Sequence, residues 1–230
     1  MTIAKNIARI RANMDAAARE AGRDPKEILL VGASKMNDAA ACREAVAAGI
    51  DALGENRVQE MVQKLEQHAY DGAPLHFIGH LQRNKVKQVV GHVALIQSVG
   101  SLELLDEIEK VAAARGLVQD ILLEVNIGRE AAKSGFAPEK VLPAAEAALE
   151  RTHVRVRGLM TIPPADAQRD ANFRYFQEVQ ALYVDMNQKL FHNELEYLSM
   201  GMSGDYEDAI RAGATMVRVG SAIFGARHYN

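Results

Sequence analysis

The sequence has little cysteine, no long apolar run and no excess of basic charge. Cys42 is the only cysteine, so the chain cannot form an internal disulfide, and its place in a predicted helix favours a small buried apolar residue over a nucleophile. No apolar run is long enough to cross a bilayer, and charged residues interrupt the N-terminal pattern of Ile3, Ile7 and Ile10, unlike a signal peptide. We therefore expect a cytoplasmic protein with no membrane partner.

Charge also argues against a nucleic-acid partner. The 230 residues carry 27 Lys and Arg against 30 Asp and Glu, a formal net charge of -3. The one locally basic stretch, formed by Arg83, Lys85 and Lys87, is too short for the extended footprint that phosphate-backbone binding needs. A solvated helix face is the interpretation we favour there.

Short apolar runs alternate with amphipathic stretches along the chain, a pattern that predicts parallel strands joined by helices. The glycine-rich G-x-G-x-x-G turn of dinucleotide-binding sheets is missing after the first strand, which argues against an open doubly wound sheet, the alternative fold. We predict one domain over residues 1–230, an α/β (β/α)8 barrel of the TIM type with an extra N-terminal helix that plugs the bottom. The predicted strands are 28–35, 52–56, 75–81, 93–98, 120–127, 154–162, 195–201 and 215–220. The predicted helices between them are 38–48, 57–68, 83–90, 101–115, 138–150, 168–191 and 204–213.

A lysine ends the first predicted strand, in the stretch "LVGASKMND". Strand alternation places Val31, Ala33 and Lys35 on one face, and in such barrels the carboxyl ends of the strands form the site. If that face points inward, burial lowers the lysine pKa from its usual ~10.4 and leaves a neutral amine that attacks aldehydes. Lys35 is thus a candidate for Schiff-base formation; the alternative is a surface lysine whose amine reaches solvent.

The ends of strands seven and eight are rich in glycine and serine, in "SMGMSGD" and "VGSAIFG". In barrels the loops after these strands often bind phosphate through backbone N–H groups. Glycine admits close approach and serine adds a hydroxyl donor, so the candidates are Ser203, Gly204, Gly220 and Ser221. Each could also be an ordinary turn or capping residue.

Arg218 shares a strand face with Gly220, and an arginine inside a barrel needs an acceptor. A pyridine nitrogen or the carboxylate of Glu124 could supply one. Since arginine keeps its proton, it would leave such a ring nitrogen unprotonated and weaken the ring as an electron sink. Asn56, in "GEN" at the end of strand two, could bind a ring hydroxyl or cap the next helix.

Taken together, "ASK", "GENRVQE", "HFIGHLQRNK", "VNI", "KSGF", "RGLMTI", "LSMGMSGDYEDAI" and "VRVGSAIFG" resemble the pyridoxal phosphate homeostasis proteins, the YggS/PROSC family. The resemblance covers the chain from about residue 28 onward. It implies a barrel like the N-terminal domain of alanine racemase, with pyridoxal phosphate held as a Schiff base on Lys35. It also implies a role in vitamin B6 homeostasis by carrying or buffering the cofactor, without robust catalysis.

By motif, the resemblance places Asn56 beside the cofactor and Arg218 at the pyridine nitrogen. It assigns phosphate binding to Ser203 of "GMS" and to Gly220 and Ser221 of "VGS", next to Gly204. Recipient apoenzymes would be the protein partners of a monomer. One stretch departs from the family: Met36, Asn37 and Asp38 stand where a "TKP"-like stretch is common, and Asn37 or Asp38 is expected to cap the next helix.

Other classes of protein remain as alternatives. The main one is a pyridoxal phosphate-dependent racemase or lyase, which needs a second acid/base. Alanine-racemase-like enzymes take this group, a tyrosine, from an additional β domain. Here the sequence runs to Asn230 directly after strand eight. Tyr206 or His80 could serve as a base. A phosphosugar aldolase would use Lys35 and the phosphate site alone. His76 and His80 share a strand face but are too few for a tight zinc site.

Overall fold

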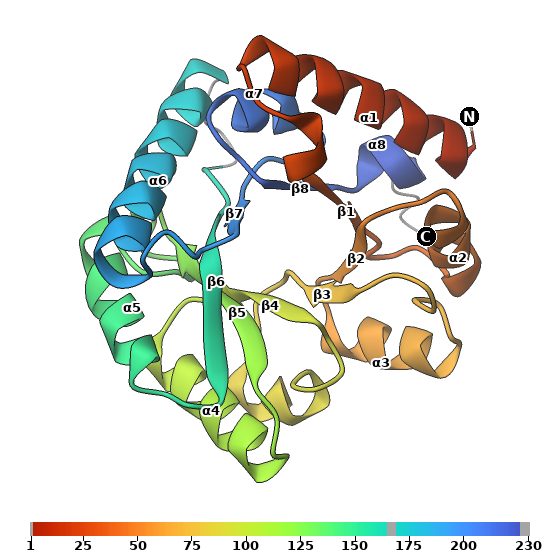
Figure 1. The fold of residues 1–230 in the computed structure, drawn as a ribbon. Coiled ribbons are helices and arrows are strands. Elements are labelled where there is room, and N and C mark those ends of the chain that lie inside the picture. The colour runs from red at the N-terminus through yellow and green to blue at the C-terminus, as the bar shows by residue number, and fades with distance from the viewer. Residues whose placement is uncertain (1, 165–168, 226–230) are drawn as a thin grey trace.

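Eight parallel strands close into a barrel that helices surround (Figure 1). The computed structural model describes residues 2–164 and 169–225. The strands follow one another around the barrel in chain order, and the last pairs in parallel with the first. They are β1 (Leu29–Ala33), β2 (Ala52–Glu55), β3 (Leu75–Phe77), β4 (Leu95–Val99), β5 (Gln119–Val125), β6 (Val154–Thr161), β7 (Tyr197–Ser199) and β8 (Met216–Val219). Closure confirms the predicted barrel and excludes the open sheet.

The helices lie between the strands as the alternation predicts. They are α1 (Ile3–Glu20), α2 (Ala39–Ala47), α3 (Val58–Glu66), α4 (Leu102–Ala114), α5 (Val141–Leu149), α6 (Arg169–Leu190), α7 (Tyr206–Arg211) and α8 (Ser221–Phe224), with 3-10 turns η1 (Pro25–Glu27), η2 (Arg83–Gln88) and η3 (Pro138–Lys140). Residue 168 of the predicted helix 168–191 lies outside the described residues. The segment predicted as a helix at 83–90 forms the shorter 3-10 helix η2, although Val86, Val89 and Val90 are all buried in the outer apolar layer.

Two apolar layers lie on the two sides of the barrel wall. The inner one fills the barrel, and its fully buried members are Val31, Ala52, Leu95, Leu122, Met160 and Met216. The outer one joins the opposite strand faces, such as Leu30 and Leu53, to the surrounding helices. Strands buried on both faces explain why their sequences are nearly continuous apolar runs.

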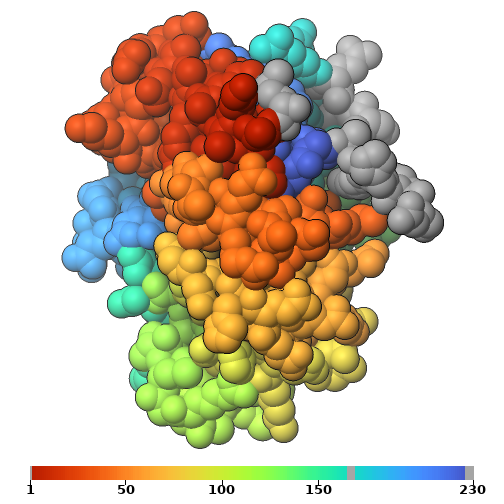
Figure 2. All heavy atoms as spheres, turned by 90° about the vertical axis from the view of Figure 1, so that its right-hand side faces the viewer, coloured from red at the N-terminus to blue at the C-terminus, as the bar shows by residue number. Residues whose placement is uncertain are grey.

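Helix α1 belongs to the outer wall, so the prediction that it plugs the barrel bottom is wrong. Its buried Ile7, Ile10 and Met14 pack in the outer apolar layer. It contacts α7, α8 and α2, and Figures 1 and 2 show it lying along α8 and beside α2. Because α8 has only four residues, α1 covers the wall that a longer final helix would cover. Asn6 Nδ2 donates to the carbonyl oxygen of Ile223 at 2.8 Å and ties the two helices together.

Cys42 is fully buried on α2, as predicted, and burial raises the pKa of its thiol. The thiolate needed for nucleophilic chemistry is therefore disfavoured. In residues 2–164 and 169–225, no helix combines the length and apolarity that a membrane span requires.

Gly158 occupies a position on β6 that a side chain cannot enter. Its φ is 150°, and a Cβ added there would overlap the carbonyl oxygen of Tyr197 on β7. The pairing of β5 with β6 also shifts register just before this residue, between Ile121 and Leu122. Glycine therefore permits the close approach of β6 and β7 on the side of the barrel opposite the β2–β3 pair.

We expect Gly158→Ala to lower the free energy of unfolding by about 3 kcal/mol, because the methyl group meets backbone and the φ is unfavourable. Gly116→Ala is the matched control: Gly116 also has positive φ, at 62°, but nothing lies within 4 Å of its added Cβ. That control should cost only about 1 kcal/mol. Urea denaturation of both variants measures the difference, and equal losses would show that the β6–β7 contact is not the constraint.

Candidate functional site

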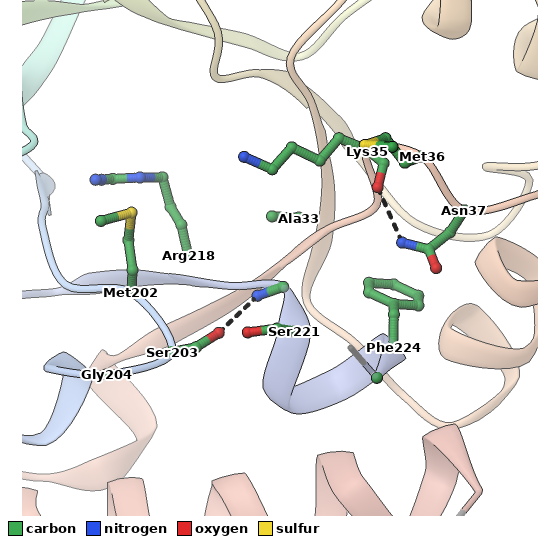
Figure 3. Close-up of a pocket in the computed structure, with 12 residues that line it drawn as sticks. Ala33, Lys35, Met36, Asn37, Met202, Ser203, Gly204, Arg218, Ser221 and Phe224 are labelled. Atoms are coloured by element: carbon green, nitrogen blue, oxygen red, sulfur yellow. Dashed lines mark hydrogen bonds between the residues drawn. The ribbon is translucent and has the colours of Figure 1, made fainter. Parts of the chain in front are cut away.

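A cavity of about 430 Å³ opens at the carboxyl ends of β1 and β8, beside the loop that follows β7 (Figure 3). It is lined by Ala33, Lys35, Met36, Asn37, Met202, Ser203, Gly204, Arg218, Gly220, Ser221, Phe224 and Gly225. Six of the seven residues that the sequence predicts to bind the cofactor therefore line this one cavity. Asn56 is the exception.

Lys35 reaches the cavity because β1 alternates its side chains across the barrel wall. Val31 belongs to the inner apolar layer, and Ala33 and Lys35 line the cavity above it. The lysine is half-buried. Figure 3 shows its amine pointing toward the side of the cavity where Arg218 lies. The inward face predicted for Val31, Ala33 and Lys35 is the one that the structure has.

The stretch after Lys35 is held by polar contacts on both sides of the turn. The Asn37 side-chain amide donates to the Lys35 carbonyl at 3.0 Å. Met36 adopts a positive φ of 62°, and its N–H donates to Glu60 on α3 at 2.8 Å. Asp38 caps α2 by accepting from the Ala41 N–H at 2.8 Å, as predicted. These contacts fix the backbone that carries the lysine.

Behind Lys35 lies a fully buried carboxylate, Glu55, at the end of β2. Its Oε1 accepts from Ser34 Oγ at 2.6 Å, from Lys64 Nζ at 2.6 Å and from the Tyr70 hydroxyl at 3.0 Å. Lys64 Nζ also donates to the Ser34 carbonyl at 2.9 Å, so β1, β2 and α3 are joined at one point. Burial and the nearby carboxylate raise the pKa of Tyr70, so the tyrosine stays a donor. Sequence reasoning missed this cluster.

The loops after β7 and β8 supply hydrogen-bond donors to the cavity. Ser203 Oγ accepts from the N–H groups of Gly220 at 3.2 Å and Ala222 at 3.4 Å, which leaves its own hydrogen available to donate. The backbone N–H groups of Ser203, Gly204 and Ser221 have no acceptor within residues 2–164 and 169–225. Several donors therefore converge at this wall, an arrangement suited to an anion.

The loop after β7 is held by an aspartate. Asp205 Oδ1 accepts from the Met202 N–H at 2.6 Å, and its Oδ2 accepts from Asn172 at 3.2 Å. Gly220 has a tight place as well, because a Cβ added there would lie 3.2 Å from the Ala33 carbonyl oxygen. Asp205 and Gly220 thus shape the donor wall, which is the side of the cavity formed by Ser203, Gly204, Gly220 and Ser221.

Arg218 projects from β8 and is 3% exposed. Its guanidinium donates to Ser199 Oγ at 2.6 Å and to the Thr161 carbonyl at 2.8 Å. No ion pair joins it to Glu124, although both residues are described, so the alternative of a direct pair with that carboxylate is not what the structure has. Burial lowers the pKa of Arg218 to about 10, which keeps the group charged at neutral pH.

Asn56 lies just after β2 and does not line this cavity. It does not cap α3 either, since the N-cap is Arg57 and that cap has no side-chain hydrogen bond. Its Oδ1 is buried without a hydrogen-bond partner among the described residues. A buried acceptor without a donor is costly, so the amide requires an explanation beyond helix capping.

The other candidates from the sequence lie elsewhere. The Tyr206 hydroxyl accepts from Asn13 of α1, on the outer wall. His80 lines a second cavity, of about 620 Å³, over the ends of β3, β4 and β5. His76 is buried and bonded to Gln97, and the described residues hold no cluster of metal ligands.

Chemically, the 430 Å³ cavity joins a primary amine, a buried guanidinium and a wall of hydroxyl and amide donors. The guanidinium and the hydrogen-bond donors favour an anionic ligand, and the amine, when unprotonated, can react with an aldehyde. A small phosphorylated carbonyl compound matches all three features, and the cavity volume lies in the range of ordinary small-molecule sites.

Comparison with known proteins identifies relatives over the full length. A family model described as alanine racemase, N-terminal domain, matches residues 6–228. The pyridoxal phosphate homeostasis protein of Pseudomonas aeruginosa is 42% identical over 99% of this chain and 97% of its own, and that of Aquifex aeolicus is 41% identical over the whole of both chains.

A solved structure agrees with these relatives. PipY of Synechococcus elongatus, with PLP (pyridoxal phosphate) bound, is 31% identical with a TM-score of 0.84 and covers 97% of this chain and 100% of PipY. The two matches above 40% identity cover the whole barrel. The chain therefore belongs to the pyridoxal phosphate homeostasis protein family, built on the fold of the alanine racemase N-terminal domain.

Proposed function

We propose that this protein binds pyridoxal 5'-phosphate in its 430 Å³ cavity and serves vitamin B6 homeostasis by carrying or buffering the cofactor. The observation that carries the proposal is the convergence of the Lys35 amine, the Arg218 guanidinium and the donor wall on one space. The names of the relatives and the PLP-bound PipY structure support it.

The cavity offers a matching group for each part of the cofactor. Lys35 would bind the aldehyde carbon covalently through Nζ. The hydroxyls of Ser203 and Ser221, with the N–H groups of Ser203, Gly204 and Ser221, would hold the phosphate, and Gly220 keeps that wall open. Arg218 would donate to the ring nitrogen. When bound, pyridoxal phosphate supplies an electrophilic aldehyde and a pyridine ring that can accept electrons.

Asn56 is proposed to lie beside the cofactor, although it does not line the cavity. Support comes from its buried Oδ1, which has no donor among the described residues, and from its position directly after β2, next to β1. An amide oxygen in that place can accept from a ring hydroxyl. Acceptance of such a bond would remove the cost of leaving the amide unpaired.

The site favours retention of the cofactor over catalysis. Lys35 and Arg218 are the only titratable groups among the described lining residues, and neither provides a second acid/base across the cavity. Arg218 stays protonated, so it leaves a ring nitrogen in contact with it unprotonated and limits the stabilisation of a carbanion. We propose a non-catalytic role, in which recipient apoenzymes take up the cofactor.

We further propose that the protein acts in the cytoplasm as a monomer. At 230 residues the chain is long enough to bury a core without a partner. The one cysteine is buried and unpaired, which suits a reducing compartment.

Incubation with pyridoxal phosphate followed by borohydride reduction is expected to leave a pyridoxyl group on Lys35, which peptide mass spectrometry detects. Lys35→Ala should lose that modification and bind the cofactor at least about tenfold more weakly, because the covalent bond is gone. Lys189→Ala, at an exposed lysine of α6 that pairs with Asp185, is the matched control and should behave like wild type. An unmodified Lys35 in the wild-type protein would refute the proposed site.

Replacement of both hydroxyls, in Ser203→Ala with Ser221→Ala, should weaken binding of pyridoxal phosphate by about 1–3 kcal/mol, since the backbone donors remain. Pyridoxal, which lacks the phosphate, serves as the control ligand and should bind wild type and the double variant equally. Absorbance titrations measure both affinities. Equal loss for the two ligands would place the phosphate away from these serines.

Loaded protein is expected to show no racemase or lyase turnover with free amino acids above the rate of the cofactor alone, because the described cavity supplies no second acid/base. Chiral chromatography after incubation with single L-amino acids measures racemisation, and assays for keto acids measure lyase products. A robust rate that requires Lys35 would replace the carrier function with the racemase or lyase alternative.

A further inference from the structure

A chain of polar side chains crosses the interior of the barrel beneath the cavity. It runs from Arg218 on β8 to Ser199 on β7, then to Gln97 on β4 and His76 on β3. The three distances are 2.6 Å from Arg218 Nη1 to Ser199 Oγ, 2.6 Å from Ser199 Oγ to Gln97 Oε1, and 3.0 Å from Gln97 Nε2 to His76 Nδ1. All four side chains are buried, with at most 6% of any residue exposed. We call these four residues the interior relay.

The direction of each hydrogen bond in the interior relay follows from its first member. Arginine has no acceptor, so Arg218 donates to Ser199, and the single Ser199 hydrogen donates to the Gln97 amide oxygen. The Gln97 amide nitrogen then donates to His76 Nδ1 and to the sulfur of Met216 at 3.1 Å. The reverse amide orientation would leave the Ser199 hydrogen without an acceptor.

His76 must therefore be neutral, with its ring hydrogen on Nε2. A proton on Nδ1 would face the Gln97 NH2 group, and two donors cannot form a hydrogen bond with each other. Burial supports the neutral form independently, since it lowers the pKa of His76 to about 4. The interior relay thus has one consistent pattern at neutral pH.

Neutral groups, instead of a carboxylate, hold the guanidinium. Ser199 takes one N–H, and the Thr161 carbonyl on β6 takes another at 2.8 Å. Two contacts from different strands fix the plane of the guanidinium, and its other N–H groups remain for a ligand at the cavity that Arg218 lines. Glu124 and Asp205 act on this cation through their charge without a hydrogen bond to it, so its free N–H groups stay available to a lone pair or anion in the cavity.

We propose that Gln97 and Ser199 are positioning residues that hold the Arg218 guanidinium in the orientation in which it meets the ring of the bound cofactor. The proposal rests on the proposed function. A long arginine side chain loses rotamer freedom when it binds, and a side chain that is already fixed loses less, so preorganisation favours affinity. Gln97 and Ser199 touch no ligand themselves and act through Arg218.

The first test needs neither a variant nor the cofactor. Nitrogen-15 NMR of the His76 ring in unloaded wild-type protein should show an unprotonated Nδ1, a protonated Nε2 and no titration until the pH falls to near 4. In Gln97→Leu the Nδ1 signal should move, because its donor is lost. A ring with protonated Nδ1 at neutral pH would overturn the bond directions and with them the interior relay.

The second test measures cofactor binding. Ser199→Ala and Gln97→Leu are expected to raise the dissociation constant for pyridoxal phosphate about tenfold and to shift the absorption maximum of the bound cofactor, because Arg218 loses its fixed orientation. Ser199→Thr keeps the hydroxyl and should restore both values. Ser98→Ala is the matched control: it removes a buried hydroxyl from the neighbouring position on β4, and that hydroxyl has no partner among the described residues.

The outcomes separate the two proposals. If wild-type protein binds the cofactor and both variants match it in affinity and absorption maximum, positioning by Gln97 and Ser199 is refuted and the proposed function stands. If Ser98→Ala shows the same loss as Ser199→Ala, the effect is a general response to altered packing, and positioning is again refuted. If wild type does not bind pyridoxal phosphate, the proposed function and the positioning role fall together.

Discussion

The site depends on one buried charge, the carboxylate of Glu55. A carboxylate inside a barrel wall needs compensating contacts, and here Lys64, Ser34 and Tyr70 all donate to Oε1, whereas Oε2 has no hydrogen-bond partner among the described residues. These contacts join the ends of β1 and β2 to α3 at the residue just before Lys35. The position of the Lys35 amine is therefore supported by a cluster whose members do not line the cavity.

The barrel interior changes character along its axis. Apolar side chains such as Val31, Leu95 and Met216 fill the lower part, and the buried polar groups of Gln97, Ser199 and Arg218 lie above them, next to the cavity. The apolar layer keeps water from the base of the site. The polar layer provides the site with hydrogen-bond donors of fixed direction. A charged guanidinium persists in this setting because oxygen atoms from two other strands accept its hydrogens.

Sequence periodicity predicted the eight strands, the barrel and the face of Lys35, because these follow from local alternation and chain order. It also brought together Ser203, Gly204, Arg218, Gly220 and Ser221, since all lie at strand ends on one rim. It missed Glu55 and the interior relay, whose partners are far apart in sequence, Gln97 and Ser199 by 102 residues. The available signal was a pair of polar residues, Gln97 and Ser98, at the end of the otherwise apolar run 93–98, which indicates buried polar side chains on that strand. Tertiary packing alone decided the place of α1.

The bond between Asn6 and Ile223 links α1, at the start of the chain, to α8, near its end, and β1 pairs with β8 beside it. The cavity is thus assembled from the first and last strands, with almost the whole polypeptide between them. During synthesis Lys35 leaves the ribosome long before the donor wall exists, so a nascent chain has an amine without a pocket. The complete cavity can therefore form only after both β1 and β8 have been synthesised.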